Sequence, residues 1–450
     1  AAGTYTLIAR LVGYESAEIA GVNVTAGGST TRNIAMTSAA VQISEMTVYG
    51  ASRRAERITE APAAIVSVAP KEIELKAASG QLPNLLESQP GVDIVQSGIQ
   101  DFNINTRGFN SSLNRRLLVL MDGRDLAIAF LGSQEWNGLP VPLGDISRLE
   151  LVRGPGSALY GPNAFNGVVN ITTPAPREVQ GSKLSFSTGE LGTQRGDFRQ
   201  AGVLDEHWSY KANIGRVQSD TWSRSRTVGD RVNGQFEYPG LSPETRKLAT
   251  GDVASLYGSG RIDYAFNDNV ATAEGGFSEV QNELFITGIG RVQVIKAHKP
   301  WGRLNLSTPN LNVMVWAQGR KSIEPQYSLL SGAALQEKSK IFNGEIQYNV
   351  NALEDALKVI LGVSGRYYEV DTDTTLMKDK HVDRAGGVFG QVEYSPTERI
   401  KFVAAGRYDR STLHEGQFSP KGAIVWTPSP DHSLRATVNQ AFQVPNYSEF

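Results

Sequence analysis

The chain has 450 residues, no cysteine and a formal net charge of −2, with 44 Lys and Arg against 46 Asp and Glu. This balance argues against a nucleic-acid-binding surface, which normally carries a basic excess, and the lack of cysteine excludes disulfides, thiolate zinc sites and a cysteine nucleophile. No apolar run approaches the roughly 18 residues of a membrane-spanning helix, whereas a membrane β-barrel, which needs only alternate apolar residues, is compatible with the composition.

Residues 1–37 are predicted to form short strands of a small β-sandwich, because the β-prone stretches 5–12, 22–25 and 34–36 are separated by glycines and polar residues. The first residues lack the charged and apolar segments of a signal peptide and lead directly into a strand. We therefore expect the sequence to be truncated at its N-terminus. Residues 38–57 are polar and poorly periodic, which indicates a flexible linker.

Residues 58–177 are predicted to form a compact mixed α/β domain. The apolar run 117–121 indicates a buried strand that ends at the turn dipeptide Asp122–Gly123. A helix is predicted from Pro70, with acidic residues in its first turn. Leu82, Leu85 and Leu86 have helical spacing and predict a second helix that ends before Pro90.

Residues 178–450 show period-two alternation, strand after strand, with one face mostly apolar and the other mixed to polar. Phe342, Ile346 and Tyr348, for example, alternate with polar neighbours, and Val388, Val392 and Tyr394 share one face of their strand. This pattern is typical of an antiparallel barrel with apolar side chains outside and polar ones in the lumen. We expect the three residues of the 388–394 strand to lie on the outer wall.

The connections in this region alternate between short turns and long loops, which is the layout of an outer-membrane barrel. We count about thirteen strands, while plugged outer-membrane transporters have 22. The sequence therefore predicts a mainly β fold with an incomplete transmembrane barrel, and we expect that the C-terminus is also truncated.

Several motifs resemble those of the TonB-dependent outer-membrane receptors. These are TRGF at 106–109, LLVLMDGRDL at 117–126, ISRLELVRGPGSALYGPNAFNGVVNITT at 146–173, and the barrel stretches 388–409 and 418–450. Asn166 stands where the family pattern has a second glycine. The segments GTYTLIARLVGYES and VNVTAGGSTTRNIAM resemble the carboxypeptidase regulatory-like domain.

The resemblance implies four parts: a regulatory-like sandwich fragment at 1–37, a linker with a TonB box at 38–57, a plug at 58–177 and a partial barrel at 178–450. It implies energised import of a scarce, bulky solute, namely an iron–siderophore, a cobalamin-like or a carbohydrate ligand. The implied partners are TonB with its inner-membrane complex, the solute and outer-membrane lipid, and we expect a monomer. A passive porin or structural barrel, or an enzyme-associated module, is the alternative.

The predicted TonB box is Glu45, Met46, Thr47, Val48 and Tyr49, at the position where the family keeps this segment. An extended stretch of β-branched and apolar residues can add a strand to the edge of a partner's sheet. The alternative is a linker strand that docks on the plug.

Two plug arginines, Arg107 and Arg153, stand in the RG motifs, and the resemblance implies that they pair with glutamates of the barrel wall. Arginine suits this role because its planar fork binds a carboxylate through two hydrogen bonds and stays charged. Glu345 and Glu393 are the candidate partners, since both fall on the lumen-facing phase of their strands. Ordinary solvated lumen charges are the alternative.

Solute contact is expected from outward-facing plug loops, 98–103 and 130–137, which combine aromatic and polar residues. The candidates are Gln100, Phe102, Phe130, Gln134, Trp136 and Asn137, although packing against the barrel wall is an equal alternative. Gly154-Pro155-Gly156 is too short a match for a phosphate loop. The five histidines are scattered, so we predict no catalytic site, metal or cofactor.

Overall fold

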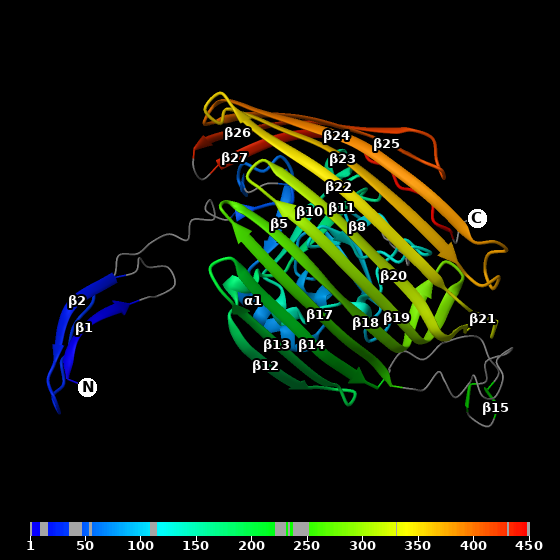
Figure 1. The fold of residues 1–450 in the computed structure, drawn as a ribbon, viewed down its shortest axis with the longest axis horizontal. Coiled ribbons are helices and arrows are strands. Elements are labelled where there is room, and N and C mark those ends of the chain that lie inside the picture. Colours follow the sequence, from blue (N-terminus) through cyan, green and yellow to red (C-terminus); the bar gives the residue numbers. More distant parts are fainter. Residues whose placement is uncertain are drawn as a thin grey trace.

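A computed structural model describes residues 2–9, 17–35, 47–53, 56–108, 115–220, 231–232, 235–236, 252–329, 331–429 and 432–447. In this part of the chain, most strands belong to one large antiparallel sheet that encloses a smaller α/β domain (Figure 1). The described helices are all too short or too polar to span a lipid bilayer.

The N-terminal strands β1 (Gly3–Ala9) and β2 (Ala17–Val24) form an antiparallel hairpin whose register shifts between Tyr5 and Leu7. A strand was expected at 34–36. Ile34 and Ala35 are not part of a strand, and Met36 lies outside the described residues. The assignment of 1–37 to a regulatory-like sandwich stays a prediction.

The plug is built on a five-stranded sheet in the order β5-β10-β11-β8-β9. Its strands are β5 (Ala64–Val68), β8 (Leu117–Met121), β9 (Arg124–Asp125), β10 (Arg148–Arg153) and β11 (Gly167–Thr172). Every residue of β8 is buried, as expected for a continuous apolar run in a sheet covered on both faces. Asp122 and Gly123 make the left-handed turn after β8, with φ of 50° and 82°, and the Asp122 carboxylate accepts hydrogen bonds from Thr173.

Short elements complete the plug and the segment that leads into it. They are the hairpins β3 (Thr47–Val48) with β4 (Glu56–Arg57) and β6 (Val92–Gln96) with β7 (Phe102–Thr106), the helices α1 (Pro70–Lys76) and α2 (Ser157–Tyr160), and 3₁₀ turns at Ala77–Ser79, Leu82–Leu85, Trp136–Gly138, Leu143–Asp145 and Pro176–Glu178. Helix α1 begins at the predicted proline. The second predicted helix is instead a single 3₁₀ turn, whose Leu82 and Leu85 are fully buried in the plug core.

The large sheet forms the wall of a half-open cylinder. Its strands are β12 (Gly181–Thr188), β13 (Gln194–Val203), β14 (Trp208–Ser219), β17 (Val253–Phe266), β18 (Asn269–Thr287), β19 (Gly290–Ser307), β20 (Leu311–Ser328), β22 (Lys338–Ala352), β23 (Leu357–Asp371), β24 (His381–Thr397), β25 (Ile400–Ser411), β26 (Gln417–Ser429) and β27 (His432–Asn439), paired in this order, with β21 (Ala334–Leu335) beside β20. A separate small hairpin joins β15 (Arg231–Val232) to β16 (Gln235–Phe236). Within the described strands, β12 and β27 are the two ends of the sheet and do not pair with each other.

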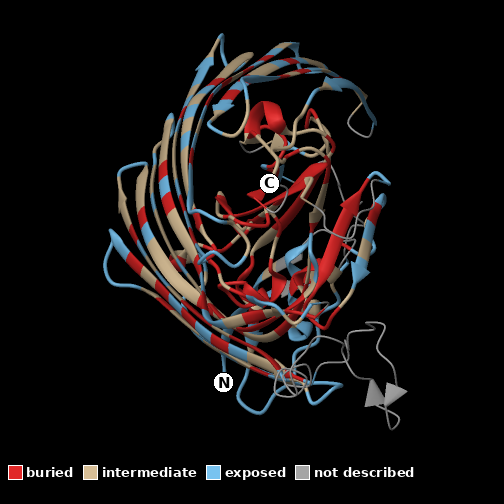
Figure 2. Ribbon diagram, turned by 90° about the vertical axis from the view of Figure 1, so that its right-hand side faces the viewer, coloured by how far each residue is buried: buried red, intermediate tan, exposed pale blue. Residues whose placement is uncertain are grey.

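The alternation of side chains along the wall confirms the predicted barrel face. Val388, Val392 and Tyr394 are exposed by 42–56%, whereas Phe389 and Glu393 on the opposite face are at most 5% exposed. Figure 2 shows the wall curving around the buried plug elements. The apolar face therefore points outward and the polar face points at the plug, as a strand of period two requires.

Candidate functional site

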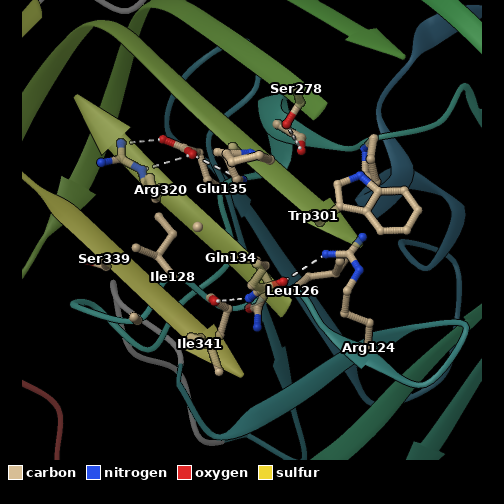
Figure 3. A pocket seen from close by; sticks show the side chains of 18 of the residues that line it. Arg124, Leu126, Ile128, Gln134, Glu135, Ser278, Trp301, Arg320, Ser339 and Ile341 are labelled. Carbon is tan, nitrogen blue, oxygen red and sulfur yellow. Dashed lines mark hydrogen bonds and ion pairs between the residues drawn. The ribbon is translucent and has the colours of Figure 1, made fainter. Parts of the chain in front are cut away.

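The interface between plug and wall is the candidate functional site, because it concentrates the buried charges of both parts. Glu135 of the plug is fully buried and receives Arg320 of β20 at 2.7 Å and Lys299 of β19 at 3.1 Å. Arg320 also pairs with Glu337 at 2.6 Å. Figure 3 shows Arg320 facing Glu135 across the plug–wall boundary. Although burial by itself would raise the pKa of Glu135, Arg320 and Lys299 lower it to about 2.

A second contact lies beside the first, at the start of the same plug loop. The Arg124 guanidinium lies 4.3 Å from the centroid of the Trp301 ring (Figure 3) and donates to Gln318 at 2.8 Å. Gln318 in turn donates to the carbonyl of Ala127 at 3.0 Å, and Asp125 pairs with Arg366 of β23 at 3.0 Å. Three wall strands, β19, β20 and β23, thus hold the loop from Arg124 to Glu135.

A third contact joins the plug to the first wall strands. Asp145 is buried and lies 2.8 Å from Lys211 and 3.5 Å from Arg199, and it accepts from Asn213 at 3.0 Å. Lys211 also donates to the carbonyl of Pro174 at 2.8 Å. The two cations and the amide offset the cost of burying the Asp145 carboxylate, since a buried charge is stable only when it is paired and hydrogen-bonded.

The segment 47–63 runs between the plug and the last wall strands. On the plug side, Tyr49 donates its backbone N–H to Glu150 at 3.0 Å, and the Tyr160 hydroxyl donates to the carbonyl of Gly50 at 2.8 Å. Thr47 and Val48 form β3, and Val48 is fully buried. Glu45 and Met46 lie outside the described residues. The described part of the predicted box therefore docks on the plug, and its contact with TonB stays a prediction.

On the wall side, the same segment is held by one carboxylate and three cations of the wall strands. Arg53 pairs with Glu345, Lys401 pairs with Glu56 at 3.3 Å, and further donors reach backbone carbonyls. These are Lys421 to Ala51 at 3.3 Å and Arg435 to Ala61 at 3.0 Å. Burial raises the pKa of Glu56 to about 7, although the positive charge of Lys401 acts to lower it.

The predicted pairing of Arg107 and Arg153 with the wall glutamates is not what the described residues show. Arg107 donates to the carbonyl of Arg153 at 3.2 Å, and Arg153 donates to the carbonyl of Pro90 at 2.6 Å. Glu345 takes Arg53 instead. Both RG arginines brace loops within the plug, where main-chain carbonyls at the ends of strands need donors.

The two glutamates do face the lumen, as their strand phase predicted. The Glu345 side chain is 12% exposed and Glu393 is 4% exposed. Glu393 accepts a hydrogen bond from Gln391 at 2.7 Å. The strand phase was thus sufficient to orient these side chains, but it could not identify their partners.

Most predicted solute-contact residues are buried in the structure. Gln100, Phe102, Phe130, Trp136 and Asn137 are 5–8% exposed, and Gln134 is half-buried. The Trp136 indole donates to the carbonyl of Phe102 at 3.0 Å, and Asn137 donates to the wall carbonyl of Ala254 at 3.3 Å. Phe130 packs with Val280 and Val294 of the wall. Phe130 and Asn137 therefore pack against the barrel wall, as the alternative interpretation of these loops had it.

Sequence reasoning missed Arg53, Glu135, Asp145 and Arg320. A signal for Arg320 existed, because Gln318, Arg320 and Ser322 share the polar phase of their strand. A cavity also lies between the plug and β22–β25, lined by Tyr160, Glu345, Arg366 and Arg407 among others.

Comparison with known proteins agrees with this architecture. Residues 57–168 match the family model of the TonB-dependent receptor plug domain, and residues 160–450 match that of the TonB-dependent receptor-like β-barrel. The vitamin B12 transporter BtuB of Vibrio cholerae is 26% identical over 422 residues, which is 90% of this chain and 64% of that protein. The ferric enterobactin receptor of Pseudomonas aeruginosa is 28% identical over 229 residues, or 46% of this chain and 30% of that one.

Solved structures share the fold. The ferric enterobactin receptor PfeA has a TM-score of 0.65 at 17% identity, covering 85% of this chain and 63% of its own. The siderophore receptor PirA from Pseudomonas aeruginosa has a TM-score of 0.60 at 19% identity, covering 85% of this chain and 65% of its own. The chain thus spans just under two thirds of these receptors, which are transporters and receptors rather than enzymes. On the match of its plug and of its β-barrel, the chain belongs to the TonB-dependent receptors of the outer membrane.

Proposed function

We propose that this chain belongs to an active transporter that imports a scarce, bulky solute through the outer membrane. The observation that carries the proposal is the set of buried ion pairs between plug and wall, Glu135 with Arg320 and Asp145 with Lys211. Removing one partner of a buried pair costs about 3–5 kcal/mol. A plug held by such contacts needs work before it clears a path, which supports an energised mechanism over a passive pore.

The proposed source of this work is TonB with its inner-membrane complex, which pulls on the segment 45–49. Residues 47–49 of this stretch begin the segment 47–63, which docks on the plug through Val48 and Tyr49 and is clamped to the wall by Glu345, Lys401 and Arg435. A pull applied there would act first on the docking of residues 47–49 on the plug and then on this clamp. We propose that the receptor works as a monomer.

The proposed solute is a ferric siderophore or a cobalamin, because the related proteins include a vitamin B12 transporter and ferric enterobactin receptors. A carbohydrate ligand is the third candidate from sequence. Of the predicted contact residues, Gln134 is the one that lines a pocket while only half-buried. The buried Trp136 and Phe130 would meet the solute only after the plug loop has moved.

Deleting residues 45–49 from the receptor that carries this chain tests the proposal. We expect uptake of radiolabelled cobalamin or ferric siderophore to fall to the background of a strain without the receptor, while surface binding of the same solute stays unchanged. A deletion of equal length at 26–30 serves as the control and should leave uptake intact. Uptake that persists after loss of 45–49 would favour the passive porin.

A further inference from the structure

After β27 the chain enters the space between the plug and the wall. Residues 442–447, which we call the strap, lie outside any strand, and Val444, Asn446 and Tyr447 of the strap line the cavity beside β22–β25. Asn446 and Tyr447 are each 5% exposed. Because irregular backbone inside a protein cannot pair with neighbouring strands, its polar groups need other partners.

The plug supplies two of these partners through a single residue, Asn163. Its backbone N–H donates to the carbonyl of Phe442 at 3.2 Å, and its side-chain oxygen accepts from the N–H of Val444 at 3.1 Å. The φ of Asn163 is 68°, in the left-handed region that asparagine tolerates better than most residues. Asn163 thus binds the main chain of the strap much as a neighbouring strand would, whatever side chains the strap carries.

The rest of the strap joins the plug loop to the wall. The Asn446 amide donates to the carbonyl of Leu131 in the plug at 3.2 Å, and the Tyr447 hydroxyl donates to the carboxylate of Asp383 on β24. The Tyr447 ring also belongs to the apolar cluster that contains Phe130 and Leu131. The strap therefore fixes the plug loop and the wall strand at the same point.

The strap lies at the long-loop end of the cavity. Asp383 stands near the start of β24, next to the long connection 372–380, whereas the Arg53–Glu345 pair lines the same cavity deeper down, halfway along β22. The cavity has an empty volume of about 1280 Å³, open solvent included. This exceeds a typical pocket for a small ligand, about 300–1,000 Å³, and suits a bulky solute. The strap thus covers its outer side, and the segment 47–63 contributes to its floor through Arg53.

We propose that the strap is the outer gate of this cavity, that Asn163 positions it, and that solute enters only after the strap has left Asn163. The hydrogen bonds that hold the strap each contribute little net stability, because water replaces them when the strap leaves. A segment without ladder pairing therefore opens at lower cost than the wall strands. The proposal rests on the import function proposed above and adds the step by which solute reaches the space between plug and wall.

The test measures access to the cavity and needs no transport. Ala385 of β24 lines the cavity and is half-buried, and the chain has no cysteine, so Ala385→Cys introduces the only thiol within it. The rate at which a bulky polyethylene glycol maleimide labels this thiol is measured in the purified receptor that carries this chain. Asn163→Gly removes one hydrogen bond and keeps the backbone unstrained, since glycine adopts a positive φ freely. Labelling should become about fivefold faster.

Matched variants separate release of the strap from a general loosening of the fold. Asn163→Asp keeps an oxygen for the N–H of Val444 and should label at the rate of the unmodified background. Tyr447→Phe frees the wall end of the strap and should also speed labelling, whereas Tyr348→Phe, on the outer wall and 46% exposed, should not. A thiol at the exposed short-turn residue Glu398 (Glu398→Cys) should react equally in every background. Equal labelling of Ala385→Cys with and without Asn163→Gly and Tyr447→Phe would overturn the proposal.

The opposite change locks the strap in place. A Cβ atom at Gly132 would lie 3.6 Å from the Cβ of Asn446, within the range of about 3.5–4.5 Å found in disulfides. The receptor with Gly132→Cys and Asn446→Cys should lose uptake of radiolabelled cobalamin or ferric siderophore when oxidised and regain it with dithiothreitol. Each single variant should be insensitive to oxidation, and undiminished uptake by the disulfide-bonded receptor would overturn the proposal. Absence of uptake by the unmodified receptor would instead contradict the import function, while the labelling rates would still decide the role of the strap.

Discussion

Arg320→Met is expected to lower the free energy of unfolding by about 3–5 kcal/mol, because it leaves buried carboxylates without their cation. Arg320 is 4% exposed and bridges Glu135 of the plug and Glu337 of the wall. Lys299, at 3.1 Å, would remain as the sole cation on Glu135. The measurement is the midpoint of urea-induced unfolding of the chain in detergent, followed by tryptophan fluorescence.

Lys321→Met is the matched control for this prediction. It removes the neighbouring charge on the same strand, but its side chain points outward and is exposed, so its effect should stay within about 0.5 kcal/mol. Equal stability of Arg320→Met and Lys321→Met would show that the bridge does not hold the plug. A second measurement uses protein whose plug has been cleaved by protease. If the two variants then have equal stability, the effect of Arg320→Met arises at the plug–wall contact.

Acidification is expected to remove a second large contribution, that of the ionised Glu135. Burial opposes ionisation, yet Arg320 and Lys299 hold its pKa at about 2 against an ordinary value of 4.5. A depressed carboxyl pKa stabilises the fold above the ordinary value, and this stability is lost as the pH falls through the folded-state value. The window is therefore from about pH 4.5 to about pH 2, and the full effect is about 3 kcal/mol at 1.36 kcal/mol per unit.

Comparison with Glu135→Gln isolates this group from the other carboxylates. The unmodified chain should be more stable than Glu135→Gln near neutral pH, and the gap should shrink as the pH falls through the window. Glu74→Gln serves as the control, since the Glu74 side chain is 73% exposed and its removal should give a small gap. A gap between the unmodified chain and Glu135→Gln that is independent of pH would contradict the assignment.

The two predictions bear on how the plug is released. The contacts of Glu135 and Asp145 lie on different wall strands, β19–β20 and β13–β14, with β17 and β18 between them. The segment 47–63 is held by other strands, β22 and β25–β27. Because these contacts share no side chain, a pull on the N-terminal segment would load the clamp before it loads the Glu135 bridge.

Local pattern was enough to predict the wall strands and the buried plug strand at 117–121, but not the plug hairpin of β6 and β7. Side chains of a strand alternate faces with a period of two, so the exposure of Val388 and Tyr394 and the burial of Glu393 follow from sequence order alone. The buried run 117–121 and the helix start at Pro70 are likewise local features. About thirteen strands were expected, and the ordered path of the large sheet contains that many within the described residues, with β21 beside it.

The partners of each charge were decided only by the tertiary structure. Glu345 faces the lumen by strand phase, but its partner is Arg53 rather than Arg107 or Arg153, because distance in space depends on how the plug sits in the hollow. The same packing buries Phe130 and Trp136, which local composition had placed in outward-facing loops. Periodicity determines which way a side chain points. Its contacts depend on segments far away in the sequence. Glu135 and Arg320 pair although 185 positions separate them, and no local pattern of residues indicates this pair.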